Sequence, residues 1–385
     1  MSDYSNSSNK PVLRWGIIGG GLMGREFASA LGRWFALTDE TLPRAELIAV
    51  CDLVEETRNW FQRVPTVKQI TASADELLAN LDVDAVYVAL PHNLHQEFYL
   101  KVLRAGKDLL AEKPFGIDLQ AAQIVRNEAE KLNRFVRCSS ELPFLPGGQR
   151  VWETLSNNLE SVGRVLEIRA GFHHSSDLDS TKPANWKRFN RTCGEAGVLN
   201  DLGMHVAHLP LRLGWKPKTV YAQLQKGFPT RPDGKGGTVE CDTWDNALLH
   251  CDVEIAGESV PMRWEMKRMA PTETNTWFIE VVGTTGGVRF STKEPKTLGI
   301  FENGKEQSWN NIDLGHKMAF GTVTGGIFEA GFPDCILQML ASFAAERAGV
   351  LGEKFGMVRP EEAVQSHEVW SAALQSHQEK RAVEV

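Results

Sequence analysis

A glycine-rich turn between an apolar run and an amphipathic segment most constrains the fold of this chain. Three glycines follow the apolar run at residues 13–19 with the spacing G-x-G-x-x-G, directly before a helix expected over residues 22–33. In such a unit the first glycine permits a tight turn, the second lets a pyrophosphate approach the backbone, and the third lets helix and strand pack closely. The turn therefore predicts a dinucleotide site at a helix N-terminus, and a glycine-rich turn without a ligand is the alternative. The predicted cofactor contacts of this turn are Gly19, Gly21, Leu22, Met23 and Gly24.

Short apolar runs alternate with amphipathic segments from residue 12 to about residue 140. Strands that are apolar throughout and separated by helices indicate a parallel sheet that is covered on both faces. The pattern predicts an α/β fold that begins with a Rossmann-type, doubly wound parallel sheet. We expect strands over residues 13–19, 46–51, 85–90, 108–111 and 135–139, and helices over residues 22–33, 94–105 and 119–132.

The pattern changes after Pro143, where strand-like runs follow one another and are joined by Gly, Pro and Asn turns. This predicts a second α/β domain with a large, open, mainly antiparallel sheet, and 385 residues are enough for two cores. We divide the chain into a disordered arm (1–11), a Rossmann dinucleotide-binding domain (12–142) and a C-terminal substrate and oligomerisation domain (143–385). In the second domain we expect helices over residues 149–157, 196–213, 333–347 and 360–380, and strands over residues 164–172, 219–226, 247–253, 259–266, 277–282 and 287–290.

Charge and composition exclude several classes of partner. The formal net charge of −7 argues against nonspecific binding to nucleic acid or to an anionic membrane surface. No apolar stretch is long enough to span a bilayer, and the polar start of the chain has no apolar signal core. The six cysteines are scattered and mostly lie within apolar runs, which fits a reducing cytoplasm.

Asp52 ends the second expected strand and is predicted to bind the adenosine ribose of the cofactor. A carboxylate at this position accepts hydrogen bonds from the ribose hydroxyls and repels a 2′-phosphate, so NAD is favoured over NADP. The distance from the glycine turn is longer than usual, because residues 34–44 resemble an inserted loop. An aspartate that only caps a helix at Leu53 is the alternative.

Two further segments follow strands at the edge where open α/β sheets bind their ligands. Glu112 and Lys113 follow the apolar run at residues 109–111 and precede Pro114, so Lys113 is expected to face the nicotinamide ring. Pro91, Asn93 and His95 follow the strand over residues 85–90 and are expected to contact the cofactor. The alternatives are a helix cap for Asn93 and ordinary packing for His95.

Asp201 and His205 lie four residues apart on an expected helix, so both project from one face. A carboxylate beside an imidazole orients the ring and raises its basicity, which suits general acid–base catalysis. An ordinary surface pair is the alternative. No H-E-x-x-H or cysteine spacing supports a zinc site near these residues, and we predict no metal.

The polar segment at residues 173–193 runs directly into this helix and is the expected substrate-recognition loop. Trp186 offers a stacking surface for a sugar ring, and Lys187 and Arg188 offer charges for an anionic group on the substrate. His173 is placed in the same predicted site. A solvated charged loop is the alternative.

The order of these motifs resembles the glucose–fructose oxidoreductase/inositol dehydrogenase/rhizopine-catabolism (Gfo/Idh/MocA) family. The resemblance rests on G-x-G-x-x-G, then Ala111-Glu112-Lys113-Pro114, then Gly197-x-x-x-Asp201-x-Gly203-x-His205, and it covers nearly the whole chain. It implies that Lys113 and His205 lie at the reacting hydroxyl with Asp201 beside them, that the peptide before Pro114 is cis, and that the open sheet mediates dimers or tetramers. The chain departs from the family pattern on the substrate side, at residues 194–197, at His208 and at residues 140–144.

The resemblance and the motifs together predict an NAD-dependent oxidoreductase. We expect it to transfer a hydride from a secondary hydroxyl of a sugar, sugar derivative or cyclitol, with Lys113 and His205 as acid–base groups and Asp201 orienting His205. One alternative is an NAD-dependent glycosidase that oxidises the sugar transiently, eliminates the glycosidic group and returns the hydride, on a possible anionic glycoside. A second is a non-catalytic regulator that senses NAD or a sugar. The predicted substrate-binding residues are Lys113, Glu141, His173, Trp186, Lys187, Arg188, Asn200 and His205.

Overall fold

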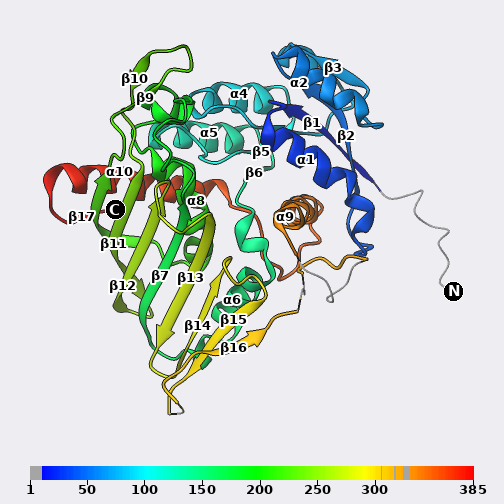
Figure 1. The fold of residues 1–385 in the computed structure, drawn as a ribbon. Coiled ribbons are helices and arrows are strands. Elements are labelled where there is room, and N and C mark those ends of the chain that lie inside the picture. The colour runs from blue at the N-terminus through cyan, green and yellow to red at the C-terminus, as the bar shows by residue number, and fades with distance from the viewer. Residues whose placement is uncertain (1–10, 305, 316–317, 324–329) are drawn as a thin grey trace.

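The described residues form two large sheets that lie side by side, joined by buried helices, and one small hairpin (Figure 1). The structure is a computed structural model that describes residues 11–304, 306–315, 318–323 and 330–385. The arm expected at residues 1–11 lies outside the described residues, apart from Pro11. Between residues 11 and 385, within the described ranges, no helix combines the length and the apolar character that a membrane span requires.

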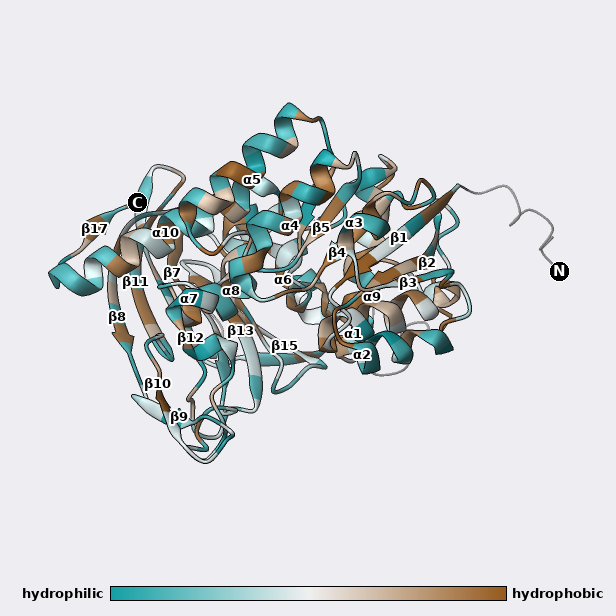
Figure 2. Ribbon diagram, turned by 90° about the horizontal axis from the view of Figure 1, so that it is seen from above, coloured by the Kyte–Doolittle hydropathy of each residue, from teal (hydrophilic) through white to brown (hydrophobic). Residues whose placement is uncertain are grey.

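The first sheet has six parallel strands in the order β3-β2-β1-β4-β5-β6, which confirms the predicted Rossmann-type sheet. Its central strands are buried along their whole length, because helices cover both faces. Figure 2 shows this as hydrophobic colour along β1, β4 and β5. The strands are β1 (Val12–Ile18), β2 (Arg44–Cys51), β3 (Gln69–Thr71), β4 (Ala85–Val88), β5 (Asp108–Ala111) and β6 (Val136–Cys138). The helices are α1 (Leu22–Gly32), α2 (Glu55–Trp60), α3 (Ala74–Leu78), α4 (His92–Arg104) and α5 (Leu119–Lys131).

Three elements of this domain were not predicted, and all three are short. The strand β3 has three residues, of which two are half-buried, so no run of apolar residues marks it. The helices α2 and α3 have six and five residues, too few to develop a helical period in the sequence. The helix α4 begins at His92 with Pro91 before it, so the expected cap at Asn93 is wrong.

The second sheet has nine strands in the order β16-β15-β14-β13-β7-β12-β11-β8-β17. Only β7 and β12 pair in parallel among the described strands of this sheet, which confirms the mainly antiparallel prediction. The strands are β7 (Val165–His174), β8 (Pro217–Gln225), β11 (Asn246–Ile255), β12 (Glu258–Lys267), β13 (Asn275–Gly283), β14 (Gly286–Ser291), β15 (Thr297–Glu302), β16 (Asn310–Asp313) and β17 (Val383–Glu384). A separate hairpin joins β9 (Thr230–Pro232) and β10 (Thr238–Glu240), and the remaining helices are α6 (Pro146–Asn157), α7 (Asn190–Cys193), α8 (Val198–Arg212), α9 (Phe332–Arg347) and α10 (Pro360–Glu379).

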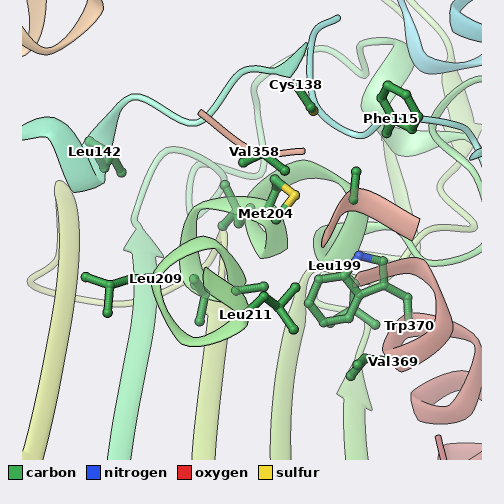
Figure 3. Packing of buried hydrophobic residues seen from close by; sticks show 14 of the residues in the cluster. Phe115, Cys138, Leu142, Leu199, Met204, Leu209, Leu211, Val358, Val369 and Trp370 are labelled. Carbon is green, nitrogen blue, oxygen red and sulfur yellow. The ribbon is translucent and has the colours of Figure 1, made fainter. Parts of the chain in front are cut away.

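The helix α8 is the central packing element, and nearly all of its side chains are buried. Figure 3 shows Leu199 beside Trp370 of α10, and Met204 near Val358 and Cys138. A Cβ atom on Gly203 would come within 2.4 Å of the Trp370 ring, so the glycine permits the close approach of α8 and α10. The packing therefore sets the position of α8, which carries Asp201 and His205, against both domains.

The helix α9 returns from the second half of the chain to pack beside α1 (Figure 1). Phe343 of α9 is fully buried, and its ring centroid lies 4.8 Å from that of Trp15 and 5.0 Å from that of Phe135. The core of the Rossmann sheet is thus completed by residues far away in the sequence. The domain boundary expected at residues 142 and 143 stays a prediction.

Candidate active site

One cavity of about 740 Å³ runs from the glycine turn after β1 to the helix α8. It lies at the carboxyl ends of the parallel strands, where open α/β sheets bind ligands. Its first part is lined by residues of the glycine turn and of the loops after β2 and β4: Gly19, Gly21, Leu22, Met23, Asp52 and Pro91. Its second part is lined by polar and aromatic side chains of both domains, among them Glu112, Lys113, Glu141, Trp186, Lys187, Asp201 and His205.

The glycine turn has the geometry that a dinucleotide phosphate requires. Gly19 has a φ of +99°, and a Cβ there would lie 2.3 Å from the Ala89 carbonyl oxygen. A Cβ on Gly24 would lie 2.3 Å from the Gly19 carbonyl oxygen, so this glycine sets the contact between α1 and β1. Gly21 has no atom within 4 Å of such a Cβ and lines the cavity just before the N-terminus of α1. The open space and the free helix amides fit a bound pyrophosphate.

Asp52 connects the glycine turn to the end of β2. Its Oδ2 accepts a hydrogen bond from the Gly20 amide at 2.8 Å, and its Oδ1 accepts one from the Val54 amide at 2.8 Å. The helix α2 begins at Glu55 and its N-cap is Val54, so Asp52 does not cap a helix that begins at Leu53. Because Asp52 also lines the cavity, its predicted contact with the ribose is sterically open.

Asp201 lies at the centre of a cluster of three cations. Its Oδ1 accepts hydrogen bonds from Lys113 Nζ at 3.2 Å and from Lys187 Nζ at 2.8 Å, and its Oδ2 accepts one from Arg268 Nε at 3.1 Å. Lys113 Nζ also donates to the Asp201 carbonyl oxygen at 2.7 Å. Lys113 follows β5 and precedes a cis peptide bond to Pro114, which confirms the predicted isomer. The cluster joins the two domains at the cavity.

The charges in this cluster are set by burial and by neighbouring groups. Burial alone would raise the pKa of Asp201, but Lys187, Lys113 and Arg268 hold it well below its usual range. Burial would lower the pKa of Lys113, but Asp201, Glu112 and Glu141 raise it above its usual value. Lys187 faces the same carboxylate, yet its burial and the neighbouring cations lower its pKa. At neutral pH Lys113 is therefore an ammonium group bound to a carboxylate.

His205 is neutral and does not pair with Asp201. Burial, followed by the charge of Lys113, lowers the pKa of His205 well below its usual value. Its Nδ1 lies 3.4 Å from the Ser140 hydroxyl oxygen and 3.9 Å from Glu141 Oε2. The prediction that Asp201 orients His205 is wrong, because the Asp201 carboxylate is taken up by the three cations. The groups that face His205 Nδ1 come from the segment after β6.

Trp186, Lys187 and Arg188 line the cavity, but they differ in their freedom to meet a substrate. The Trp186 ring packs edge-on against His92 at 4.7 Å, across the domain boundary. Arg188 is buried and donates to Asp177 at 2.5 Å and to Asp245 at 2.8 Å, so its charge is already paired. Arg188 therefore stabilises the loop rather than offering a free cation.

Five predicted site residues lie outside the cavity lining, and one of them is Gly24, which packs against the Gly19 carbonyl oxygen. His95 contacts the carbonyl oxygens of Pro114 and Leu90, and burial lowers its pKa to about 4, so it holds two loops together. Asn200 is buried and donates to two carbonyl oxygens, and Asn93 is exposed on α4. His173 lies on the outer face of the large sheet, 3.5 Å from Glu265.

The cavity lining also includes residues that the predicted site did not, among them His92, His174 and Arg268. His174 follows His173 on β7, and alternation places them on opposite faces, but the sequence did not show which face is inward. Arg268 directly follows β12, a strand in which charged and apolar residues are mixed, so its charge did not stand out in the sequence. Among the described residues, no group of three or more His, Cys, Asp or Glu side chains is arranged to hold a metal ion.

Two family models match the chain over most of both domains. The first, an oxidoreductase family with an NAD-binding Rossmann fold, matches residues 13–139, and the second, the GFO/IDH/MocA C-terminal domain, matches residues 159–289. The chain belongs to the GFO/IDH/MocA oxidoreductase family. This confirms the predicted family, the predicted enzyme class of NAD-dependent oxidoreductases, and NAD as the cofactor.

Similar proteins support the same assignment. Trans-1,2-dihydrobenzene-1,2-diol dehydrogenase of Xenopus tropicalis is 25% identical over 335 residues, covering 85% of this chain and 90% of that protein. Glucose-6-phosphate 3-dehydrogenase of Bacillus subtilis is 29% identical over 221 residues, covering 57% and 59%. The solved structure of levoglucosan dehydrogenase with NADH and L-sorbose has a TM-score of 0.86, with 20% identity over 97% of this chain and 99% of that one. At this identity the structural likeness shows the fold alone.

The two glycines of α1 provide a matched test of the cofactor turn. We expect Gly24→Ala to weaken NAD binding at least about tenfold, because a Cβ 2.3 Å from the Gly19 carbonyl oxygen pushes α1 away from β1. Gly32→Ala has no atom within 4 Å of the new methyl group and should leave the Kd unchanged. Titration calorimetry measures both, and equal Kd values for the two variants would contradict the role given to Gly24.

Proposed function

We propose that this protein oxidises a secondary hydroxyl of a sugar, a sugar derivative or a cyclitol, with NAD as the hydride acceptor. The observation that carries the proposal is the single cavity that runs from the glycine turn to Lys113 and His205. The relatives support the substrate class, because glucose-6-phosphate 3-dehydrogenase and levoglucosan dehydrogenase are named for sugars. Physiological direction is left open, since the same groups serve both directions.

The cofactor supplies the redox chemistry, and the chain supplies the acid–base groups. NAD, when bound, takes up a hydride at C4 of its nicotinamide ring. Lys113 is held as an ammonium group, so we give it the role of donating a hydrogen bond to the substrate oxygen and stabilising the negative charge that develops there. His205 is neutral at neutral pH, so it is the group that can accept the hydroxyl proton.

Asp201 is proposed as a positioning residue for the two lysines. It binds both Lys113 and Lys187 through Oδ1, and Arg268 through Oδ2, which fixes the lysines at the cavity wall. Two lysine side chains at the cavity wall favour a substrate with an anionic group. Lys187 is the cation proposed to meet that group, with Trp186 as the stacking surface beside it.

We also propose that the protein is a homo-oligomer, a dimer or a tetramer, that works in the cytoplasm. The outer face of the large sheet carries a hollow lined by partly buried charged residues such as Arg169, Glu280 and Arg289, which suits contact with a second copy. All six cysteines are buried and free, which suits a reducing compartment, and cell fractionation tests that location. Light scattering should give at least twice the mass of one chain; the mass of a single chain would exclude the oligomer.

The stoichiometry of NADH formation tests the proposed reaction. The purified protein is incubated with NAD and a panel of sugars, uronates, sulfo-sugars, cyclitols and their glycosides, while absorbance and released aglycone are both followed. We expect one NADH for each substrate molecule oxidised. Aglycone release with catalytic NAD and no net NADH would establish the glycosidase instead, and tight NAD binding without any turnover would favour the regulator.

The lysine and histidine are tested by substitution. We expect Lys113→Ala and His205→Ala each to lower turnover by about 10²–10⁴-fold, since each removes a group that acts on the reacting oxygen. Lys131→Ala is the control, because Lys131 is exposed on α5, away from the cavity. Steady-state kinetics measure the effect, and near-normal turnover of either variant would refute its assigned role.

A further inference from the structure

Glu141 is a buried carboxyl group in the cavity wall that the proposed chemistry has not yet used. It follows β6, is 7% exposed, and lines the second part of the cavity. Its Oε2 lies 3.9 Å from His205 Nδ1. Glu141 is therefore the carboxyl group whose contact with the His205 ring is closest to hydrogen-bonding distance.

The orientation of the His205 ring determines which neighbour can exchange a proton with it. Nδ1 faces the Ser140 hydroxyl oxygen at 3.4 Å as well as the Glu141 carboxyl group. Asp201 is on the same helix, but three cations occupy its oxygens. The other ring nitrogen, Nε2, is left for a substrate hydroxyl in the cavity.

The environment of Glu141 brings its proton affinity close to neutrality. Burial, followed by the charge of Glu112, raises the pKa of Glu141 to about 7, although the nearby Lys113 opposes the rise. Glu112 itself accepts hydrogen bonds from the Tyr87 hydroxyl at 2.5 Å and from the Lys113 amide at 3.1 Å. The titratable groups that face Glu141 are Glu112 and Lys113 after β5, His205 on α8, Tyr87 on β4, Cys138 on β6 and Cys335 on α9.

We propose that Glu141 is the final acceptor, within the protein, of the proton that leaves the substrate hydroxyl. The O–H bond of the substrate breaks and its proton joins His205 Nε2, while the Nδ1 proton passes to a Glu141 carboxylate oxygen, directly or by way of the Ser140 hydroxyl. The hydrogen on the same carbon leaves with its bonding pair as a hydride, for which bound NAD would be the acceptor, and the C–O bond becomes a carbonyl. Glu141 then releases its proton through the cavity, exchange of the ring protons with cavity water restores the Nδ1–H form of His205, and reduction of a carbonyl runs the same path backwards.

This role rests on the proposed function and has a distinct pH signature. Oxidation needs ionised Glu141, so wild-type kcat should rise with pH through about 7 and then level off. Glu141→Gln should lack this rise and lose about 10–100-fold of kcat at pH 8, with KM nearly unchanged. Glu141→Asp should restore part of kcat with a shifted rise. A Glu141→Gln variant that keeps the wild-type pH profile would overturn the proposal, and so would a change confined to KM.

A second measurement works even if no sugar is turned over. The raised pKa of Glu141 leaves the free energy of unfolding unchanged below about pH 4.5, where the group is protonated in both the folded and the unfolded chain. As the pH rises towards 7, the free energy of unfolding falls, because the unfolded chain loses the proton first. Glu141→Gln should therefore raise Tm over the wild type more at pH 8 than at pH 5, in the full chain with NAD bound. Glu97→Gln, on the exposed side of α4, is the control and should show no such difference.

Direct observation of the Glu141 carboxyl group tests its titration separately from the proposed sugar substrate. Isotope-edited infrared spectra of the NAD-bound protein should show a protonated carboxylic acid that titrates near pH 7 and is missing in Glu141→Gln. Titration of this group below pH 5 would overturn the role of Glu141, whatever the panel shows. If the carboxyl group titrates as expected while no sugar is oxidised, the proposed substrate class fails and the titration of Glu141 stands.

Discussion

The contact of one carboxylate with three cations determines the arrangement of the active site. Asp201 on α8 binds Lys113 from the Rossmann sheet, Lys187 from the loop before α8, and Arg268 from the end of β12. These groups come from segments that are distant in sequence and from both domains. Without the carboxylate, one buried and two partly buried cations would repel one another across the cavity, so the domain contact and the site depend on the same side chain.

This arrangement gives Lys113 and His205 different charges, which their residue types alone could not distinguish. Lys113 is bound to Asp201 and stays charged, which suits stabilisation of an oxyanion. His205 is buried next to that ammonium group and stays neutral, which suits acceptance of a proton. Either residue alone was a plausible base from its type. The charges of Lys113 and His205 depend on their neighbours, and these neighbours come together only in the folded chain.

Local patterns in the sequence predicted the parts of the site that follow from backbone geometry. The glycine turn, the strand that precedes Lys113, and the helix with Asp201 and His205 are each encoded within a few residues. The face on which a residue lies was harder to predict: His173 and His174 are adjacent on β7, and the sheet turns them to opposite sides. The pairing of Arg188 with Asp177 and Asp245, and of Asp201 with Arg268, depends on loops that meet only after folding.

The surroundings of the two glutamates at the sheet edge also depend on contacts that form only on folding. Glu112 and Glu141 follow neighbouring strands, and both line the cavity. Glu112 accepts hydrogen bonds from two donors, the Tyr87 hydroxyl and the Lys113 amide. Glu141 faces the His205 imidazole, and burial, followed by the negative charge of Glu112, raises the pKa of Glu141 to about 7. Two identical side chains on adjacent strands thus meet different partners: two hydrogen-bond donors at Glu112, and an imidazole and a second carboxyl group at Glu141.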